Sequence, residues 1–319
     1  MNRCTVIVVN WNSWEILAEC LDKLQKQVFR DFRVTVVDNS SIQPVPVEFL
    51  KRYSEVQFIV NRENVGFAAA NNQRIFASND NEFVALLNPD AFPDAEWLQR
   101  LVDAADHYLE YAAFGSRQLM DREVDVLDGE GDVVHVSGLV WRNGFGRRAS
   151  DDIAPREIFT PCAAAALYRK EALRAVGGFD EDFFCYIEDV DLGFRLQLKG
   201  YRCLLVPGAV VHHVGSATTG GRQSDFAIYH GHRNMVWMYV KDMPGWIFWV
   251  CLPLHIAMNL SAIVLFTFRG RFSTIIKAKR DAIFGLRRMW RKRREIQNAR
   301  SVPISRIWRI MDKSLFLRR

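Results

Sequence analysis

Carboxylates and histidines concentrate at three places in the sequence, and these places indicate where chemistry could occur. Residues 180–191 hold six acidic side chains interleaved with Phe and Tyr. Asp90 follows the apolar run 83–87, and two histidines, His212 and His213, follow another apolar run. A carboxylate in a partly apolar wall can serve as a general base, because burial raises its pKa. Carboxylates together with an imidazole also suit a divalent metal ion.

Each of these residues also has a structural explanation that involves no chemistry. Glu188 and Asp189 would lie near the start of a predicted helix, where acidic side chains complement the helix dipole. Asp90 could cap a simple turn. Only one of His212 and His213 can face a site, because neighbouring side chains on an extended segment point in opposite directions.

Four short apolar segments near the N-terminus predict the strands that would position these side chains. They are residues 5–9, 34–37, 56–60 and 83–87. Helical patterns lie between them, at 14–24 and 67–77, and the strand centres recur about every 25 residues, as in βαβ units. This alternation predicts an α/β fold with a mostly parallel central sheet flanked by helices.

The residues just past the predicted strands are candidates for binding, because a parallel sheet binds ligands at the carboxyl ends of its strands. Asp38 directly follows a strand, where its carboxylate could accept hydrogen bonds from a nucleobase or from ribose hydroxyls. Asn88, Pro89 and Asp90 follow the fourth strand. A carboxylate at that point suits a divalent cation that also binds a diphosphate.

The second half of the sequence is less regular. Residues 121–161 carry clustered Gly, Asp and Arg, which indicates an insertion or mobile loop covering the site. A helix is predicted at 189–199 and is closed by Gly200. A strand at 202–206 follows, and then the apolar stretch that ends in the two histidines.

Charge is distributed unevenly along the chain. Residues 269–319 hold 17 Lys and Arg against three acidic residues, a net charge of +14, whereas the first 268 residues carry a net charge of −9. Such a basic tail is expected to bind phosphate groups, either of nucleic acid or of anionic lipid. The acidic body and the apolar segment beside the tail disfavour nucleic acid, so we expect an anionic membrane surface as the partner.

An uncharged segment precedes the basic tail. No residue between Asp242 and Arg269 carries a formal charge, and residues 246–268 are long enough to cross a bilayer. Six scattered cysteines and an N-terminus without a signal-peptide pattern predict a cytoplasmic body, so a single crossing would oppose the positive-inside tendency. We therefore expect a segment lying in the interface or a re-entrant hairpin bent at Pro253. A buried helix pair in a soluble protein is the alternative.

Six motifs, in order, resemble glycosyltransferase family 2, the inverting enzymes built on the GT-A scaffold. They are V-I-V-V-N-W-N-S at 6–13, V-V-D-N-S-S at 36–41, N-R-E-N-V-G-F-A-A-A-N-N at 61–72, L-L-N-P-D-A at 86–91, F-D-E-D-F-F-C-Y-I-E-D-V-D-L-G-F-R-L at 179–196 and P-G-A-V-V-H-H-V-G-S at 207–216. The combination of N-x-N, N-V-G-F-A and N-P-D is most similar to bacterial rhamnosyltransferase-like enzymes of O-antigen and cell-wall polysaccharide synthesis.

The resemblance implies roles for individual residues. Asp189 would be the catalytic base, with Glu188 as the second candidate. A divalent ion, Mg²⁺ or Mn²⁺, would bind Asp90 and His212 and bridge the donor diphosphate. The nucleotide would be bound by Asn10, Asn12, Asp38, Asn64, Gly66, Asn88 and Arg233.

One residue departs from the family pattern. The first Asp of the family's D-x-D motif is Asn88 here, so metal binding would depend more on Asp90. Asn88 is also the one feature that favours a sugar-nucleotide-binding protein without activity.

The resemblance also implies a reaction and a place in the cell. A sugar would pass from a nucleotide-diphosphate donor to an acceptor hydroxyl by direct displacement, with inversion at the anomeric carbon. We expect dTDP-L-rhamnose as the donor and a lipid-linked or polysaccharide acceptor, and a UDP-hexose or UDP-galactofuranose donor is the alternative. A GT-A domain would occupy residues 1–240, and helices at 241–319 would hold it at the cytoplasmic face of the bacterial membrane.

Overall fold

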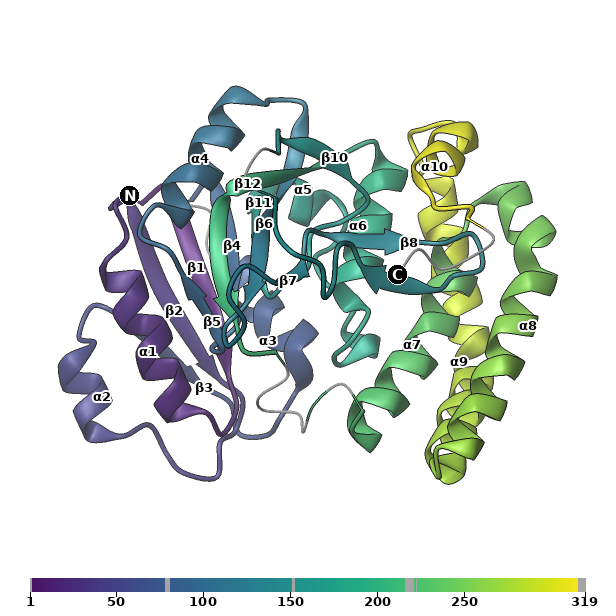
Figure 1. The fold of residues 1–319 in the computed structure, drawn as a ribbon, viewed down its shortest axis with the longest axis horizontal. Helices are drawn as coiled ribbons and strands as arrows, with labels where there is room; N and C mark the ends of the chain where they lie inside the picture. Colours follow the sequence, from purple (N-terminus) through teal and green to yellow (C-terminus); the bar gives the residue numbers. More distant parts are fainter. Residues whose placement is uncertain (1, 78–80, 151–152, 216–220, 222, 315–319) are drawn as a thin grey trace.

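The computed structural model describes residues 2–77, 81–150, 153–215, 221 and 223–314. Within them, a central sheet is flanked by helices on both faces, and further helices near the C-terminus pack beside it (Figure 1). The α/β architecture with a C-terminal helical region, as predicted from the sequence, is confirmed.

The central sheet contains the four predicted N-terminal strands as β1 to β4. In the described part of the chain its strands are β1 (Cys4–Asn10), β2 (Phe32–Asp38), β3 (Gln57–Val60), β4 (Phe83–Leu87), β5 (Ala91–Pro93), β6 (Tyr111–Met120), β7 (Leu127–Gly129), β10 (Arg156–Ile158), β11 (Ala165–Arg169) and β12 (Arg202–His213). The main order is β10-β12-β6-β11-β4-β1-β2-β3. The four neighbouring strands β4, β1, β2 and β3 are parallel to one another. Strand β11 lies antiparallel beside β4, and β6 and β12 form another parallel pair.

Two apolar layers bury the sheet, which explains why its strands are continuous runs of Val, Ile and Leu. The covering helices are α1 (Trp14–Gln25), α2 (Val47–Arg52), α3 (Gly66–Ile75), α4 (Trp97–His107), α5 (Lys170–Ala175) and α6 (Glu188–Lys199). Val6 and Val8 of β1 pack in one core with Leu17 of α1 and Trp97 of α4. Ile7 points to the other face, where α3, α5 and α6 contribute the core.

Residues 121–161, which the sequence predicts to be an insertion or mobile loop, contain short strands in their described part. Among them, β8 (Asp132–Val134) and β9 (Val140–Arg142) form a separate two-stranded sheet, and β7 and β10 pair with β6 and β12. The two apolar stretches predicted at 202–206 and 210–213 belong to one strand, β12. Its pairing with β6 shifts register between Val206 and Val210, where Pro207 and Gly208 interrupt the ladder.

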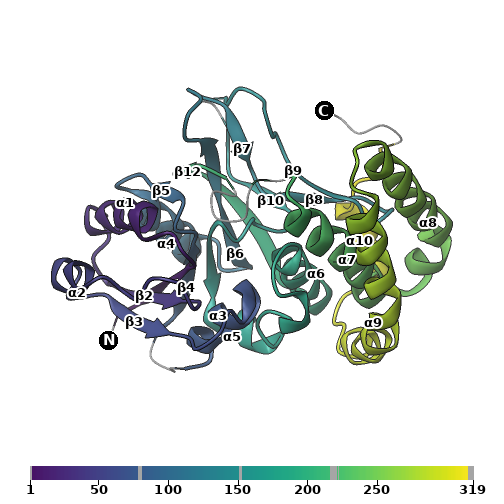
Figure 2. The same ribbon diagram turned by 90° about the horizontal axis from the view of Figure 1, so that it is seen from below.

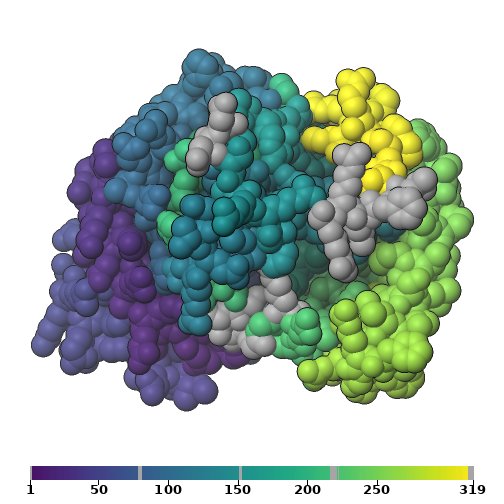
Figure 3. Space-filling view, viewed as in Figure 1, coloured from purple at the N-terminus to yellow at the C-terminus, as the bar shows by residue number. Residues whose placement is uncertain are grey.

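The C-terminal helices are α7 (Asp225–Asp242), α8 (Gly245–Phe268), α9 (Phe272–Asn298) and α10 (Ile304–Ile310), and they form one side of the molecule (Figures 2 and 3). Pro253 lies inside α8, which is continuous. The chain reverses instead after α8, where Gly270 has a φ of 72°, and α9 returns beside it. The predicted hairpin bent at Pro253 is therefore wrong, because the helix accommodates this proline.

The helix α8 has two chemically different sides. It is long and apolar enough to cross a membrane by length and composition. Two of its polar residues nevertheless contact other parts of the protein: His255 Nδ1 donates to the carbonyl of Ser137 at 2.7 Å, and Lys279 Nζ donates to Asn259 Oδ1 at 2.5 Å. The opposite side is apolar and exposed, through Trp249, Val250, Leu254, Ile256, Leu260, Val264 and Phe268. The helix therefore lies along the body with an apolar surface outward.

Buried charges join the C-terminal helices to the sheet domain. Lys241 of α7 and Asp191 of α6 are fully buried and form an ion pair. Lys241 Nζ also lies 2.6 Å from Asp180 Oδ2, and Arg195 Nη2 lies 2.7 Å from Asp191 Oδ2. Lys292 of α9 reaches the other oxygen of Asp180 at 2.5 Å. The network thus connects α6, α7 and α9, and α7 itself extends across the predicted domain boundary at 240.

Removing Lys241 tests this network. We expect Lys241→Ala to lower the free energy of unfolding by about 3–5 kcal/mol, because Asp191 and Asp180 stay buried but lose the ammonium group that pairs with both of them. Urea denaturation followed by circular dichroism measures the change.

Lys51→Ala on the exposed surface of α2 is the matched control, with an expected change within about 0.5 kcal/mol. Equal unfolding free energies for the two variants would show that the network does not hold the helices.

Candidate active site

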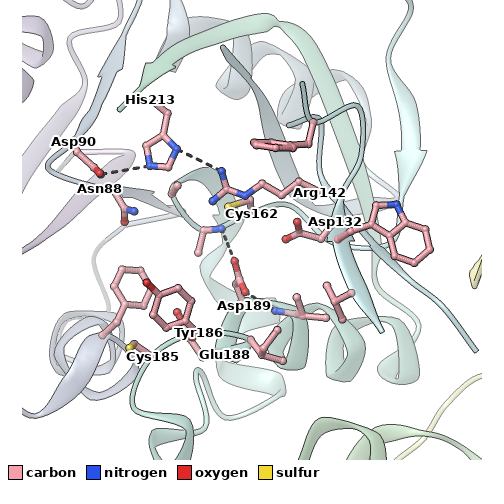
Figure 4. Close-up of a pocket in the computed structure, with 18 of the residues that line it drawn as sticks. Asn88, Asp90, Asp132, Arg142, Cys162, Cys185, Tyr186, Glu188, Asp189 and His213 are labelled. Carbon is pink, nitrogen blue, oxygen red and sulfur yellow. Dashed lines mark hydrogen bonds and ion pairs between the residues drawn. The ribbon is translucent and has the colours of Figure 1, made fainter. Parts of the chain in front are cut away.

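A cavity of about 1270 Å³ opens beside the carboxyl ends of β1 and β4 (Figure 4). One wall comes from residues past the strand ends, including Trp11, Asn39 and Asn88. The β8–β9 hairpin and the loop 143–147 form a second wall. The third comes from the loop 184–187 and the start of α6. The cavity therefore lies where the sheet order predicts ligand binding.

Asn39 organises the loops on the strand side of the cavity. Its Nδ2 donates to Asn64 Oδ1 at 2.8 Å, and its Oδ1 accepts from Asn61 Nδ2 and the Val65 amide, both at 3.1 Å. Asn64 Oδ1 also accepts from the amide of Gly66 at 3.0 Å. Asn64 and Gly66, two of the predicted binding residues, line the cavity. Asn39 lines it as well, at a position past a strand end where ligand binding is expected but for which no role was predicted.

Three other predicted nucleotide residues do not line the cavity. Asn10 and Asp38 are buried side by side, because β1 and β2 pair in register and Asn10 Nδ2 donates to Asp38 Oδ1 at 2.9 Å. The Asp38 carboxylate also accepts from the amide and hydroxyl of Ser41. Asn12 is exposed and accepts from the amide of Ile42 at 2.7 Å. These residues fix the loops behind the cavity wall.

Gly66 permits a close contact between two walls. Its φ is +85°, and a Cβ at this position would lie 2.6 Å from atoms of Phe184. The amide of Ala68, two residues later, donates to the carbonyl of Phe184 at 3.1 Å. A side chain at position 66 would therefore push the loop 184–187 away from α3.

Asp90 faces a histidine across the cavity floor. His213 Nε2 lies 3.4 Å from Asp90 Oδ1 (Figure 4). His213 Nδ1 lies 2.7 Å from Asp128 Oδ2. All three side chains are buried, and Asn88 lies beside them in the cavity wall. A carboxylate on one ring nitrogen orients the other nitrogen, which is the usual second-shell arrangement of histidine ligands to metals.

The structure corrects the choice between the two histidines. His212 was selected from the sequence, but it points away from the cavity, with its Nε2 3.4 Å from Asp94 Oδ1 and 41% of its side chain exposed. His213 takes the inner position because β12 pairs with β5 so that His213 lies opposite Ala91. Alternation along the strand then turns His212 outward.

Arg142 of β9 adds a positive charge to this part of the cavity. It forms an ion pair with Asp128, and its Nη1 lies 3.4 Å from His213 Nδ1. The β8–β9 hairpin therefore supplies a cation close to the pair of Asp90 and His213. Apart from the clustering of Asp and Arg in this region, no sequence pattern indicates a role for Asp128 or Arg142.

Asp189, the predicted base, lies in the cavity at the start of α6 (Figure 4). Its Oδ2 accepts from the amide of Ala163 at 3.1 Å, and its Oδ1 accepts from the amide of Val190 at 2.9 Å. Burial raises the pKa of Asp189, while these N–H donors and Arg142 act to lower it. The net result is a pKa above the ordinary value for aspartate, in a carboxylate whose orientation is fixed.

Glu188, the second candidate base, also lines the cavity. Its side chain is buried, and its Oε2 has no hydrogen-bond partner in the described part of the chain. Burial, with Asp189 next to it, raises the pKa of Glu188 well above the ordinary value. Glu188 Oε2 is therefore not anchored by a hydrogen bond among the described residues, whereas both oxygens of Asp189 accept from backbone donors.

A second group of possible metal ligands includes Asp189 itself. Asp132, Cys162 and Asp189 each bring one potential ligand atom within 4.8 Å of the others. Burial raises the pKa of the Cys162 thiol to about 12. Sulfur is a soft ligand that does not suit Mg²⁺ or Mn²⁺, so Asp90 and His213 fit a hard divalent ion better.

The loop before Asp189 is held in an unusual conformation. Phe184, Tyr186 and Ile187 have positive φ values of 66°, 64° and 70°. Asn234 of α7 is fully buried, and its Nδ2 donates to the carbonyls of Phe183, Cys185 and Tyr186 at 2.7–2.9 Å. Such backbone strain persists only where surrounding contacts impose it, so the Asn234 amide fixes the wall that carries the base.

Arg233 was predicted to contact the nucleotide, but it has a different place. It does not line the cavity, and its Nη2 donates to the carbonyl of Phe183 at 3.0 Å. Its guanidinium lies 4.3 Å from the ring centroid of Trp237. The helix α7 turns this side chain toward the loop rather than the cavity, so Arg233 supports the loop together with Asn234.

Comparisons with known proteins identify the family of this chain. The sequence model described as "Glycosyl transferase family 2" matches residues 5–177, and that of "Glycosyl transferase family group 2" matches residues 101–275. The chain is 28% identical over 265 residues to the N-acetylglucosaminyl-diphospho-decaprenol L-rhamnosyltransferase of Mycobacterium tuberculosis, an alignment that covers 76% of this chain and 85% of that protein.

Two solved structures share the fold. GalNAc-T7, in a crystal structure with UDP, GalNAc and Mn²⁺, superposes with a TM-score of 0.61 at 14% identity, over 76% of this chain and 48% of that chain. This chain thus spans about half the length of GalNAc-T7. A mannosyltransferase from Pyrobaculum calidifontis, in complex with GDP-Man and Mn²⁺, superposes with a TM-score of 0.54 at 16% identity, over 88% of this chain and 87% of that chain.

The match to the first family model covers more than half of the sequence, and the fold agrees with it. We conclude that the chain belongs to glycosyl transferase family 2 and is a glycosyltransferase.

Proposed function

We propose that this enzyme transfers L-rhamnose from dTDP-L-rhamnose to a hydroxyl group of a lipid-linked glycan or polysaccharide, with inversion at the anomeric carbon. The observation that carries the proposal is that one cavity contains both an anchored carboxylate, Asp189, and the facing pair of Asp90 and His213. The named activity of the mycobacterial relative supports rhamnose and a lipid-linked acceptor. A UDP-sugar donor is the second candidate, favoured by the UDP bound in GalNAc-T7.

In the proposed reaction, Asp189 is the general base. Its carboxylate takes the proton of the acceptor hydroxyl, and the oxygen then attacks the anomeric carbon of the donor. The bond from that carbon to the diphosphate oxygen breaks, and its electron pair leaves with the nucleoside diphosphate. Attack opposite the leaving group inverts the configuration, so no covalent intermediate with the enzyme is required.

The donor diphosphate would lie at the opposite side of the cavity. Asn88, Asp90 and His213 offer an amide oxygen, a carboxylate and an oriented imidazole, a donor set that suits Mg²⁺ or Mn²⁺. When bound, such an ion would offset the charge of the leaving diphosphate. Arg142, next to His213, would add a second positive charge.

The nucleoside would bind near the strand ends. Trp11, Asn39 and Asn64 line the cavity there and offer an aromatic ring and amide groups. Asn10, Asn12 and Asp38 would act indirectly in this arrangement, because their side chains hold the loops that carry these groups. A direct contact from Asp38 to the base would need the hydroxyl of Ser41 to move.

We propose that residues 241–319 hold the 1–240 domain at the cytoplasmic face of the bacterial membrane. The exposed apolar side of α8 and the basic residues of α9 support contact with an anionic surface. The contacts of His255 with Ser137 and of Asn259 with Lys279 of α9 support a helix lying in the interface rather than crossing the bilayer. A lipid-linked acceptor would then reach the enzyme from the same surface.

A thermal-shift panel tests the donor. We expect dTDP with Mn²⁺ to stabilise the protein more than UDP, GDP or CMP with Mn²⁺. A ligand at 100 times its Kd stabilises by about 2.7 kcal/mol, which is readily measured.

Selective stabilisation by UDP would keep the enzyme class and replace the rhamnose donor. No response to any nucleotide would contradict the proposed function.

The histidine pair provides a matched test of the metal site. We expect His213→Ala to weaken Mn²⁺ binding at least 10-fold, since loss of even a second-shell partner costs about 10–100-fold in metal affinity. His212→Ala changes the neighbouring residue outside the cavity and should leave binding unchanged. The Mn²⁺ dependence of the dTDP thermal shift measures both. Equal behaviour of the two variants would remove His213 from the site.

Substitution of the base tests the chemistry. We expect Asp189→Asn to lower kcat by about 10²–10⁴-fold, the usual contribution of a general base, and to leave the dTDP thermal shift intact. Because burial raises the pKa of Asp189, activity of the unmodified enzyme should fall on acidification at a pH above the ordinary aspartate range.

Glu188→Gln is the control for this substitution, and it should retain most of kcat because Glu188 is not the proposed base. A larger loss in Glu188→Gln than in Asp189→Asn would exchange the two roles.

A further inference from the structure

The positive charge of α9 is only partly used by contacts within the protein. Arg288 and Lys292 pair with Asp182, and Arg293 donates to the carbonyls of Val240 and Met243. The remaining exposed arginines of this stretch are Arg287, Arg291 and Arg294, and no partner is found for them among the described residues. They are spaced four and three residues apart, so they lie on one side of the helix.

These three arginines border a groove between α7, α8 and α9. The groove has a volume of about 950 Å³. Its apolar lining comes from Val240, Phe248, Leu252, Phe284, Leu286 and Trp290. Its polar lining consists only of arginines, the three above and Arg288. An apolar floor with a cationic rim matches an amphiphile that carries both an acyl chain and a negative charge.

The groove continues into the outward apolar side of α8. Trp290 in the groove packs against Phe248, with ring centroids 5.7 Å apart, and against Trp249, at 6.3 Å. Trp249 is 63% exposed on the outer side of the same helix. A lipid in the groove would therefore lie next to the surface that we propose faces the membrane.

We propose that this groove is a binding site for one anionic phospholipid. The acyl chain would lie on Phe248, Leu252 and Trp290, and the phosphate would lie among Arg287, Arg291 and Arg294, whose guanidinium groups can each donate two parallel hydrogen bonds to phosphate oxygens. This inference rests on the membrane location proposed above and assigns that contact to specific residues.

A membrane phospholipid fits the groove better than the glycan acceptor does. The acceptor must bring a hydroxyl group to Asp189, but the groove and the central cavity have no lining residue in common. Nucleic acid could use the arginines and stack bases on the aromatic side chains, but the aliphatic side chains of Val240, Leu252 and Leu286 fit an acyl chain and offer a nucleic acid no stacking surface. The combination of charge and apolar surface therefore selects a lipid.

Vesicle co-sedimentation of the full chain tests this site. The vesicles are phosphatidylcholine alone, or phosphatidylcholine with an equal part of phosphatidylglycerol. Each arginine near an anionic surface contributes about fivefold to partitioning, so the triple variant Arg287→Gln, Arg291→Gln, Arg294→Gln should bind the anionic vesicles on the order of 100-fold more weakly. All three side chains are exposed, so the thermal unfolding midpoint should not change.

The matched control removes three exposed arginines from the sheet domain: Arg30→Gln, Arg122→Gln, Arg148→Gln. It changes the net charge equally, and its binding to anionic vesicles should stay near that of the unmodified chain. Equal losses in the two triple variants would show that only net charge matters and would overturn the site. This assay measures vesicle binding and not sugar transfer. A negative result would therefore contradict the lipid site without contradicting the proposed reaction.

Soluble ligands separate the possible occupants. We expect dihexanoyl-phosphatidylglycerol, below its micelle concentration, to raise the unfolding midpoint of the full chain but not that of the groove variant. Stronger stabilisation by a short polyprenyl diphosphate through the same arginines would assign the groove to the acceptor and overturn the proposal. Tighter binding of a short RNA through them would overturn it in favour of nucleic acid.

Discussion

The buried ion pair between Lys241 and Asp191 is the constraint on which the other parts of this structure depend. Two fully buried charges are costly to desolvate, and they are stable only while each has its partner. Asp191 lies two residues after Asp189 on α6, and Lys241 lies at the end of α7. Asp180 and Lys292 extend the pairing to α9. The position of the proposed base and the position of the C-terminal helices are therefore fixed by the same charges.

A second connection joins the helices to the cavity from the other side. The loop between β8 and β9 carries Ser137, whose carbonyl accepts from His255 of α8. The same hairpin supplies Arg142 to the cavity. The helix with the outward apolar surface thus supports one wall of the cavity, while Asn234 of α7 supports another. Catalytic and C-terminal helical regions share one set of contacts rather than meeting at a linker.

The sequence predicted those features that depend on local pattern. The strands β1 to β4 were found because a buried parallel strand is a short apolar run, and the cavity followed from the position of strand ends. His213 could not be chosen over His212, because the pairing of β12 with β5 decides which side chain faces inward. Arg233 and Asp128 depend on contacts between distant segments, and nothing in the neighbouring residues indicates those contacts.

The left-handed residues Phe184, Tyr186 and Ile187 have a consequence for the evolution and engineering of this enzyme. Each such position costs of order 1–3 kcal/mol, so the loop reduces the stability of the fold that surrounds it. Glycine would remove the steric part of that cost at each position, because it adopts positive φ without strain. The same change would release the aromatic wall of the cavity and the approach to Asp189. Selection for thermostability and selection for turnover should therefore act on this loop in opposite directions.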